Sequence, residues 1–304
     1  MNSKKKPYYI SLLIISTFLW GSSYPIGKNL LDEINSSTLV FFRLLIASLI
    51  LAIYIKFSRE KFSKLSWTQW IWTIIISSLG VGGFNIIIFS GLAYTNPTNA
   101  SLIMSFSPLL TSLIVCFMHR RPPPKDKIIG LLLGIFGVFI VITNGNIQST
   151  FYSKINYGDI LIFIGMVCWS IYTYCCNSIS KWMPTSQFTF VGMISGAAIS
   201  GIAYHLTSPI PLFEELKNIN SITMIGIIYI GLFGTVISYF CWLKGVHHLG
   251  ALTASSFFNF IPIFSLLTAS LLGNPISAIQ ALGVIVVIFG LSIPHLNEVL
   301  FKKN

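Results

Sequence analysis

Arg43 is the only charged side chain that lies well inside an apolar stretch of this sequence, and no Asp or Glu accompanies it. A guanidinium in such a place can bind a carboxylate or a phosphate through two parallel hydrogen bonds. It can also serve the structure, by pairing with backbone carbonyl groups or by extending toward the edge of the apolar layer. Arg43 is therefore a candidate anion-binding residue, and both interpretations stay open.

Six aromatic residues with a polar edge form a second candidate group, spread over three apolar stretches. They are Trp20, Tyr24, Trp169, Tyr172, Tyr239 and Trp242. Indole and phenol rings can hold an amphipathic or cationic solute by stacking and by cation–π contact. Many aromatic residues in apolar segments are instead packing or interface residues. Asn85 carries a buried amide that needs a hydrogen-bond partner. Its side chain can face the cavity in which these aromatic residues would hold a solute.

Two prolines, Pro108 and Pro262, lie in the middle of apolar stretches, each among small polar residues. Each proline frees a backbone carbonyl and allows the helix to kink. The polar residues nearby include Ser101 and Ser105 in the first stretch and Asn259 in the second. These side chains can line a substrate cavity or replace the hydrogen bonds that the prolines remove, and both can hold at once.

The sequence indicates no catalytic chemistry. It contains no nucleophile–base pairing, metal-ligand spacing or phosphate-binding loop, so we predict a protein that is not an enzyme and needs no cofactor or metal. A membrane-embedded enzyme would need His, Asp, Glu or Cys residues gathered inside the apolar stretches, and acidic residues are missing there. The five cysteines lack metal-site spacing and are expected to be packing residues.

The elements that position these residues are expected to be membrane-spanning helices. Of the 304 residues, 54% are apolar and only 9% are charged, whereas a soluble domain would carry about a quarter charged residues. Ten apolar stretches each have about the length needed to cross a bilayer. They are residues 8–30, 39–57, 70–92, 97–117, 128–144, 160–180, 188–206, 222–243, 251–272 and 277–293. We therefore predict an all-α membrane protein with ten transmembrane helices.

The basic residues indicate the orientation of these helices. Fifteen Lys and Arg residues fall on one side of the predicted membrane and only three on the other. Because basic loops remain in the cytoplasm, both termini are predicted to be cytoplasmic, in a multi-pass protein of the cell (inner) membrane. The net charge of +11 is then a topology signal and not a nucleic-acid-binding patch.

The two halves of the chain share a residue pattern at a constant spacing of 154. The corresponding pairs are Gly91 and Gly245, Ala100 and Ala254, and Pro108 and Pro262. Each half holds five expected helices, and because five is odd the second half must cross the membrane in the opposite sense. Secondary transporters use such an inverted repeat to build a midplane site between the halves. We predict the repeats at residues 1–146 and 147–304, together forming one transport domain.

The sequence resembles the drug/metabolite transporter superfamily, in its EamA-type ten-helix branch. The resemblance rests on Trp20–Tyr24, Phe42–Leu44, Gly91–Tyr94, Asn99–Ser101 and Ser107–Pro108, and on Tyr239–Trp242, Gly250–Ser255 and Asn259–Pro262. Such families usually carry a Gly-Glu-Arg turn after helices four and nine, where this chain has His119–Pro122 and Leu272–Pro275. The resemblance implies alternating-access transport of small organic metabolites, often amino acids or related solutes. It also makes Arg43 a family hallmark whatever the substrate.

Several expectations about function remain open at this point. Some superfamily relatives carry a nucleoside-linked metabolite such as S-adenosylmethionine, and a non-transporting membrane scaffold is an alternative outside transport. The expected partners are a small-molecule substrate and the lipid bilayer, not nucleic acid, with the chain a monomer or a weak dimer. None of the eight acidic residues lies deep in a span, and Asp159 sits at the outer end of the sixth. This distribution favours facilitated diffusion or solute exchange over proton coupling.

Overall fold

The computed structural model is helical in every regular element that it describes. It describes the chain except residues 1–5, 32, 59–60, 96–99, 101–102, 105, 121, 123–124, 145, 147–155, 209–210, 218, 272, 274–275 and 302–304. Among the described residues, seven helices are long and apolar enough to cross a membrane. Three shorter apolar helices lie at Ser107–His119, Ile128–Val141 and Ala278–Gly290. The prediction of an all-α membrane protein with ten apolar helical segments is confirmed.

The described helices follow one another in two series. The first series is α1 (Lys6–Leu31), α2 (Ser36–Ser58), α3 (Trp67–Ser77), η2 (Ser78–Gly83), α4 (Phe84–Tyr94), α6 (Ser107–His119) and α7 (Lys125–Thr143). The second is α9 (Tyr157–Ile179), α10 (Thr185–Thr207), α11 (Leu212–Lys217), α12 (Ser221–Gly231), η3 (Leu232–Ile237), α13 (Ser238–Leu249), α14 (Ala251–Ser256), η4 (Phe257–Asn259), α15 (Phe260–Leu271) and α16 (Ala278–Phe301).

Several helices begin before the apolar run that predicts them, because a polar residue caps them. Helix α3 begins at Trp67 after a capping box in which Ser66 accepts from the Gln69 N–H. Helix α9 begins at Tyr157 after the equivalent box formed by Asn156 and Asp159. Such caps satisfy backbone N–H groups that the first helical turn leaves without partners. The sequence prediction followed hydrophobicity and therefore placed these starts about three residues late.

The third and eighth spans are each interrupted by a π-helical segment at the same place in the repeat. Segment η2 joins α3 to α4, and η3, which begins 154 residues later, joins α12 to α13. Both segments contain glycine, and a Cβ on Gly82 would lie 2.9 Å from the Cα of Gly196 in α10. Single π-helical turns are rare and are found mostly at functional sites. Their symmetric positions indicate that both halves retain the same distortion.

The fourth and ninth spans are also interrupted, next to the two prolines. Pro108 lies in the first turn of α6 and Pro262 in the first turn of α15. The preceding turns match, since the Phe106 N–H donates to the Ile103 carbonyl and the Phe260 N–H donates to the Phe257 carbonyl. Proline suits a first helical turn because its fixed φ is helical and its missing N–H needs no partner there. The predicted kinks are therefore helix breaks that end at these prolines.

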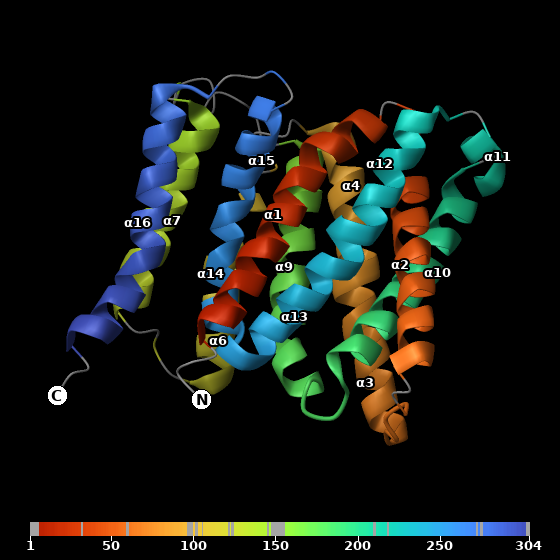
Figure 1. Cartoon of the computed structure of the whole chain (residues 1–304), viewed down its shortest axis with the longest axis horizontal. Helices are drawn as coiled ribbons and strands as arrows, with labels where there is room; N and C mark the ends of the chain where they lie inside the picture. Colours follow the sequence, from red (N-terminus) through yellow and green to blue (C-terminus); the bar gives the residue numbers. More distant parts are fainter. Residues whose placement is uncertain are drawn as a thin grey trace.

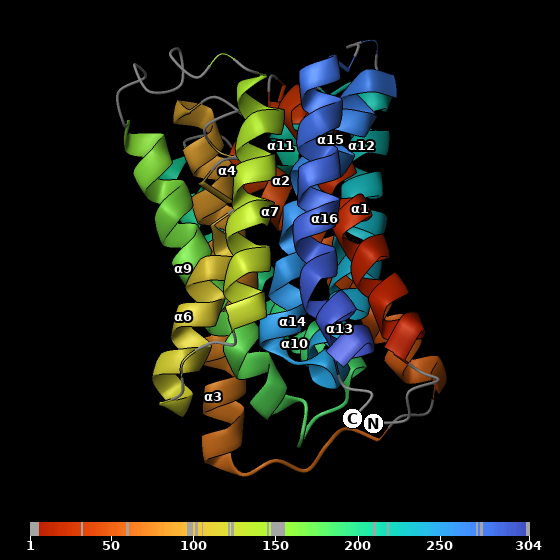
Figure 2. The ribbon, with the colours of Figure 1, turned by 90° about the vertical axis from the view of Figure 1, so that its left-hand side faces the viewer.

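The helices pack into one bundle with a separate pair at its edge (Figures 1 and 2). Both termini lie at the same end of the bundle. Helices α1, α2, α4, α9, α10, α12 and α13 contribute most of one continuous hydrophobic core. Helices α7 and α16 pack closely on each other at the edge. There Gly137 and Gly283 bring the backbones together, because a Cβ on Gly137 would lie 2.8 Å from the Gly283 carbonyl oxygen.

Candidate functional site

A wide cavity opens at the end of α1 that lies away from the two termini. Its volume is about 880 Å³, and it is lined by α1, α2, α4 and α15 together with Ala100 and Met104. The polar residues in its lining are Lys28, Asn29, Asn35, Ser36, Ser90 and Ser265. We call this cavity the vestibule. It is large enough for a small metabolite, since ligand pockets are typically about 300–1,000 Å³.

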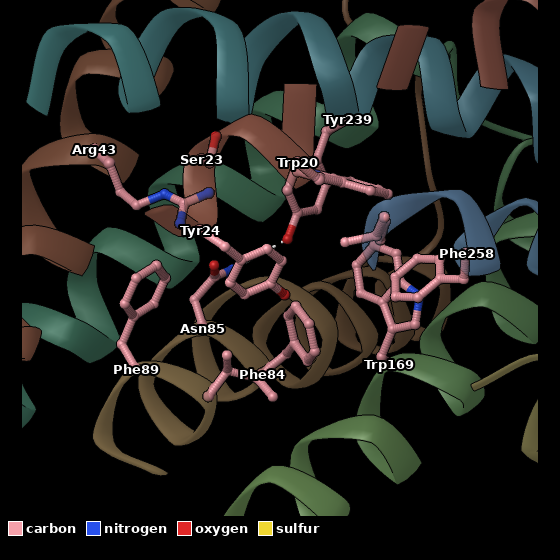
Figure 3. Close-up of a pocket in the computed structure, with 12 residues that line it drawn as sticks. Trp20, Ser23, Tyr24, Arg43, Phe84, Asn85, Phe89, Trp169, Tyr239 and Phe258 are labelled. Atoms are coloured by element: carbon pink, nitrogen blue, oxygen red, sulfur yellow. Dashed lines mark hydrogen bonds between the residues drawn. The ribbon is translucent and has the colours of Figure 1, made fainter. Parts of the chain in front are cut away.

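A second, much smaller cavity lies deeper in the bundle (Figure 3). It measures about 30 Å³ and is lined by six of the predicted site residues and their neighbours. The six are Trp20, Tyr24, Arg43, Asn85, Trp169 and Tyr239. We call it the inner cavity. Tyr24 lines both cavities, so its ring lies at the boundary between them. The inner cavity has space for about one water molecule and none for a metabolite.

Arg43 is buried and is held by the other half of the chain. Its Nε donates to Thr235 Oγ1 at 3.0 Å, and its Nη2 donates to the Gly234 carbonyl oxygen at 3.3 Å. Both partners lie in the π-helical segment η3. The guanidinium carbon also lies 5.4 Å from the centre of the Phe89 ring, in a cation–π contact. In this structure Arg43 pairs with a backbone carbonyl group, as its structural interpretation expects. Its side chain also lines the inner cavity.

The carbonyl oxygen of Gly234 is the meeting point of this network. It accepts hydrogen bonds from Trp20 Nε1 at 3.1 Å and from Ser238 Oγ at 2.7 Å, in addition to the one from Arg43. Ser16 extends the network by donating to the Ser238 carbonyl oxygen at 2.9 Å. Side chains of α1 and α2 are therefore fixed to η3 by polar contacts inside an apolar bundle, where each such contact avoids a costly unpaired group.

Aromatic rings pack against one another beside the inner cavity. The Trp20 ring lies 5.2 Å from Trp169, 5.3 Å from Trp242 and 5.6 Å from Phe258 between centroids. Trp169 is also 4.9 Å from Phe84. Tilted and edge-to-face pairs at these distances are attractive beyond their buried area. Trp20, Trp169, Phe84 and Phe258 line the inner cavity, and Trp242 packs against three of them, so we call these rings the aromatic floor.

Asn85 and Tyr239 pair with each other across the two halves. Asn85 Nδ2 donates to Tyr239 Oη at 3.0 Å and to the Val81 carbonyl oxygen at 2.7 Å. The two residues are 154 positions apart in the sequence, which is the spacing of the repeat. Equivalent positions that touch must lie near the axis relating the halves. The amide that the sequence predicted to need a partner therefore has one, at the centre of the molecule.

Other predicted site residues lie outside the two cavities. Tyr172 packs between Trp169 and Phe188, and Trp242 is fully buried in the floor with no partner for its Nε1. Asn259 faces α7, because a Cβ on Gly134 would clash with its Nδ2, and neither polar atom of its amide has a hydrogen-bond partner among the described residues. Ser101 and Ser105 lie outside the described residues.

Several lining residues were not singled out from the sequence. Phe84, Phe89 and Phe258 line the inner cavity, and Lys28 lines the vestibule. Phenylalanine is common in every span, so nothing in the sequence marks these three. Lys28 stands out as one of the few basic residues on the sparsely charged side of the predicted membrane, and that signal could have identified it.

Two acidic side chains, Asp159 and Glu33, contact residues at helix starts and do not line either cavity. Asp159 accepts from the Thr95 hydroxyl at 2.5 Å and from the Asn156 N–H. Glu33 accepts from Asn220 and Thr223 at the start of α12, each at 2.7 Å. Carboxylates are stabilised at helix N-termini by the helix dipole. Within the described part of the chain, no group of three or more His, Cys, Asp or Glu residues could hold a metal ion.

Known proteins resemble this chain over nearly all of its length. An uncharacterized transporter of Bacillus subtilis, YyaM, is 30% identical over 93% of this chain and 91% of its own. A second one from the same organism, YrdR, is 26% identical over 97% and 94%. An S-adenosylmethionine/S-adenosylhomocysteine transporter of Chlamydia muridarum is 23% identical over 86% and 82%.

A solved crystal structure has the same fold, with a TM-score of 0.75 at 17% identity over 94% of this chain and 96% of that chain. The profile of the EamA-like transporter family matches residues 7–143 and again residues 156–293. The two matches correspond to the two series of helices, and both contribute to the inner cavity. The chain therefore belongs to the EamA-like transporter family.

Proposed function

We propose that this transporter moves small organic metabolites, amino-acid-like or related amphipathic solutes, by alternating access as a secondary transporter. One observation carries the proposal: an 880 Å³ vestibule reaches in from one end and stops at Tyr24. Beyond Tyr24 lie a buried cation, an amide and a closed aromatic floor. Access from one side to a polar, aromatic centre is the arrangement that alternating access requires.

Within this proposal the substrate moves past Tyr24 and occupies the inner cavity as the floor separates. Trp20, Trp169 and Tyr239 would then stack on its apolar part, while Arg43 and Asn85 would bind its polar groups. Tyr172, Trp242, Asn259, Ser101 and Ser105 complete the proposed site in other conformations. Pro108 and Pro262 end the helix breaks that allow α6 and α15 to change angle.

The proposed orientation places both termini in the cytoplasm of the cell (inner) membrane, with the vestibule facing outward. The two halves act together as one transport domain. The excess of Lys and Arg at the end that carries the termini supports this orientation. Reporter fusions at Lys64 and at the C-terminus should both report the cytoplasm, and an external signal from either would contradict it.

The alternative substrate is a nucleoside-linked metabolite such as S-adenosylmethionine, taken up or exchanged. The Chlamydia muridarum relative supports this alternative, because that protein is named as a transporter of S-adenosylmethionine and S-adenosylhomocysteine. An adenine ring would suit the aromatic residues, because each base presents a flat face for stacking. The vestibule volume accommodates either class of solute.

The test is uptake of labelled solutes into liposomes that contain the purified protein. The panel holds amino acids, S-adenosylmethionine and S-adenosylhomocysteine, and protein-free liposomes give the background. We expect saturable uptake of at least one solute, reduced strongly in Trp20→Ala. The matched control is Trp67→Ala, because Trp67 is 79% exposed on the outside of the bundle. Equal uptake with and without protein for the whole panel would contradict the proposal.

A further inference from the structure

The vestibule carries a positive charge that no structural role in the described chain accounts for. Lys28 lies in the last turn of α1 and lines the vestibule. Its side chain is exposed, and no hydrogen bond or ion pair joins it to another residue within the described ranges. A cation at a helix C-terminus is favoured by the helix dipole. That effect explains why lysine is tolerated there, but it does not neutralise the charge.

Two neighbouring carboxylates, Glu215 and Glu33, are bound to residues at helix starts. Glu215 accepts from the Asn35 N–H at 2.6 Å and from the Thr38 hydroxyl, so it caps the start of α2. Glu33 is held in the same way at the start of α12. Both acidic groups compensate helix N-termini, and neither lines the vestibule. Among the described residues, the polar lining that remains consists of amides and hydroxyl groups around one ammonium group.

A second cation lies further along the same path. Arg43 lines the inner cavity, which meets the vestibule at Tyr24. A solute that enters at Lys28 and proceeds past Tyr24 therefore meets two positive charges in sequence. In a cleft with low-dielectric walls, charges of one sign concentrate ions of the opposite sign and disfavour ions of their own sign.

We infer that the vestibule is an anion-attracting entry site and that Lys28 selects solutes bearing a carboxylate or phosphate group over purely cationic ones. This inference rests on the proposed transport function and specifies its substrate class. Zwitterionic solutes enter with the carboxylate leading. The sulfonium group of S-adenosylmethionine is disfavoured relative to its uncharged thioether counterpart, S-adenosylhomocysteine.

The first test measures the electrostatic potential of the vestibule without any transport. Ser90, a half-buried lining residue, is changed to Cys in a full-length protein whose five native cysteines are replaced by Ala. Reaction rates of an anionic and a cationic methanethiosulfonate reagent are compared, each normalised to its rate with a free thiol. We expect the anionic reagent to react on the order of tenfold faster. The preference should fall in Lys28→Gln and reverse in Lys28→Glu.

The matched control is Lys217→Gln, because Lys217 is an exposed lysine of α11 that does not line the vestibule. It should leave the ratio of rates unchanged. A ratio of one in the parent protein would overturn the inference, as would a ratio that Lys28→Glu leaves unchanged.

The second test adds to the transport panel purely cationic amines, each the counterpart of a panel amino acid without its carboxylate. Each solute that the liposomes accumulate should bear a carboxylate or phosphate, and Lys28→Glu should raise its KM with little change in maximal rate. Faster uptake of a purely cationic solute would overturn the inference while leaving the transport function intact. Absence of all uptake would contradict the transport function, and the reagent ratio would still decide whether the vestibule attracts anions.

Discussion

Arg43 joins the two halves of the transporter at a single buried point. Hydrogen bonds of charged groups contribute about 1.5–3 kcal/mol each. The guanidinium makes two such bonds to η3, to the Thr235 hydroxyl and the Gly234 carbonyl. A substrate anion that bound Arg43 would compete with these bonds and would loosen α2 from η3. The same residue can therefore serve both packing and binding, in different conformations.

Two variants separate these roles. Arg43→Lys should lower the melting temperature by several degrees, because an ammonium group cannot reproduce the planar fork. Thr235→Val removes the acceptor for Arg43 Nε but keeps the shape and the guanidinium, and should destabilise to a similar extent. If Arg43 also binds substrate, only Arg43→Lys will raise KM several-fold. Equal KM values in the two folded variants would exclude the binding role.

The π-helical segments are the elements most suited to move between conformations. Segments η2 and η3 occupy equivalent places in the two halves, and Arg43 and Trp20 bond to the second. Segment η2 packs on α10 through Gly82, whose Cα hydrogens face the backbone of Gly196. Helix α10 follows closely along α2 and η2. A change of angle at η2 would therefore be transmitted to α10 and α2.

Neighbouring glycines in η2 provide a matched pair of variants. A Cβ on Gly82 would lie 2.9 Å from the Gly196 Cα, whereas one on Gly83 would meet only the Ser78 carbonyl oxygen at 3.5 Å. Gly82→Ala should therefore lower the free energy of unfolding by about 1–3 kcal/mol through overpacking. Transport should fall in proportion to the loss of folded protein. Gly83→Ala should leave thermal stability and transport nearly unchanged. Similar stability of the two variants, measured by thermal unfolding in detergent, would show that α10 does not restrain η2.

At the scale of the whole molecule, the vestibule is open at one end and ends at Tyr24 beside the inner cavity, and under the proposed function this arrangement is one state of the transport cycle. Three of the acidic groups, Asp159, Glu33 and Glu215, are held by residues at the starts of α9, α12 and α2. Proton-coupled carriers relay protons through carboxylate or histidine groups that can reach both sides. A carboxylate fixed as a helix cap cannot do so. The solute gradient is then the expected driving force, by facilitated diffusion or exchange.

Liposomes at clamped membrane potential test this expectation. A pH gradient alone should produce no accumulation above equilibrium, whereas unlabelled solute inside should accelerate uptake of labelled solute several-fold. Asp159→Asn should retain this exchange, since the amide oxygen can still accept from the Asn156 N–H while the amide NH2 donates to the Thr95 hydroxyl. Uphill accumulation driven by the pH gradient and lost in Asp159→Asn would instead identify Asp159 as the coupling group.

The sequence by itself determined the ten spans, the repeat spacing and half of the residues around the inner cavity. Hydrophobic length identifies spans, and a polar or charged residue within one is costly, so Arg43 and Asn85 stood out without a structure. The tertiary structure alone decided which faces meet. Helices α2 and α12 are apolar on nearly all sides, so the sequence does not indicate their buried faces.

The tertiary structure also determined which residues far apart in the sequence contact each other. Arg43 and Thr235 are 192 residues apart, and only the docking of one half on the other joins them. The same docking directs Asn259 toward Gly134 and away from the cavities, although its neighbours resemble those of Ser105. The π-helical segments and the one-sided vestibule also depend on it, because a local sequence specifies a helix but not the contacts that distort or separate helices.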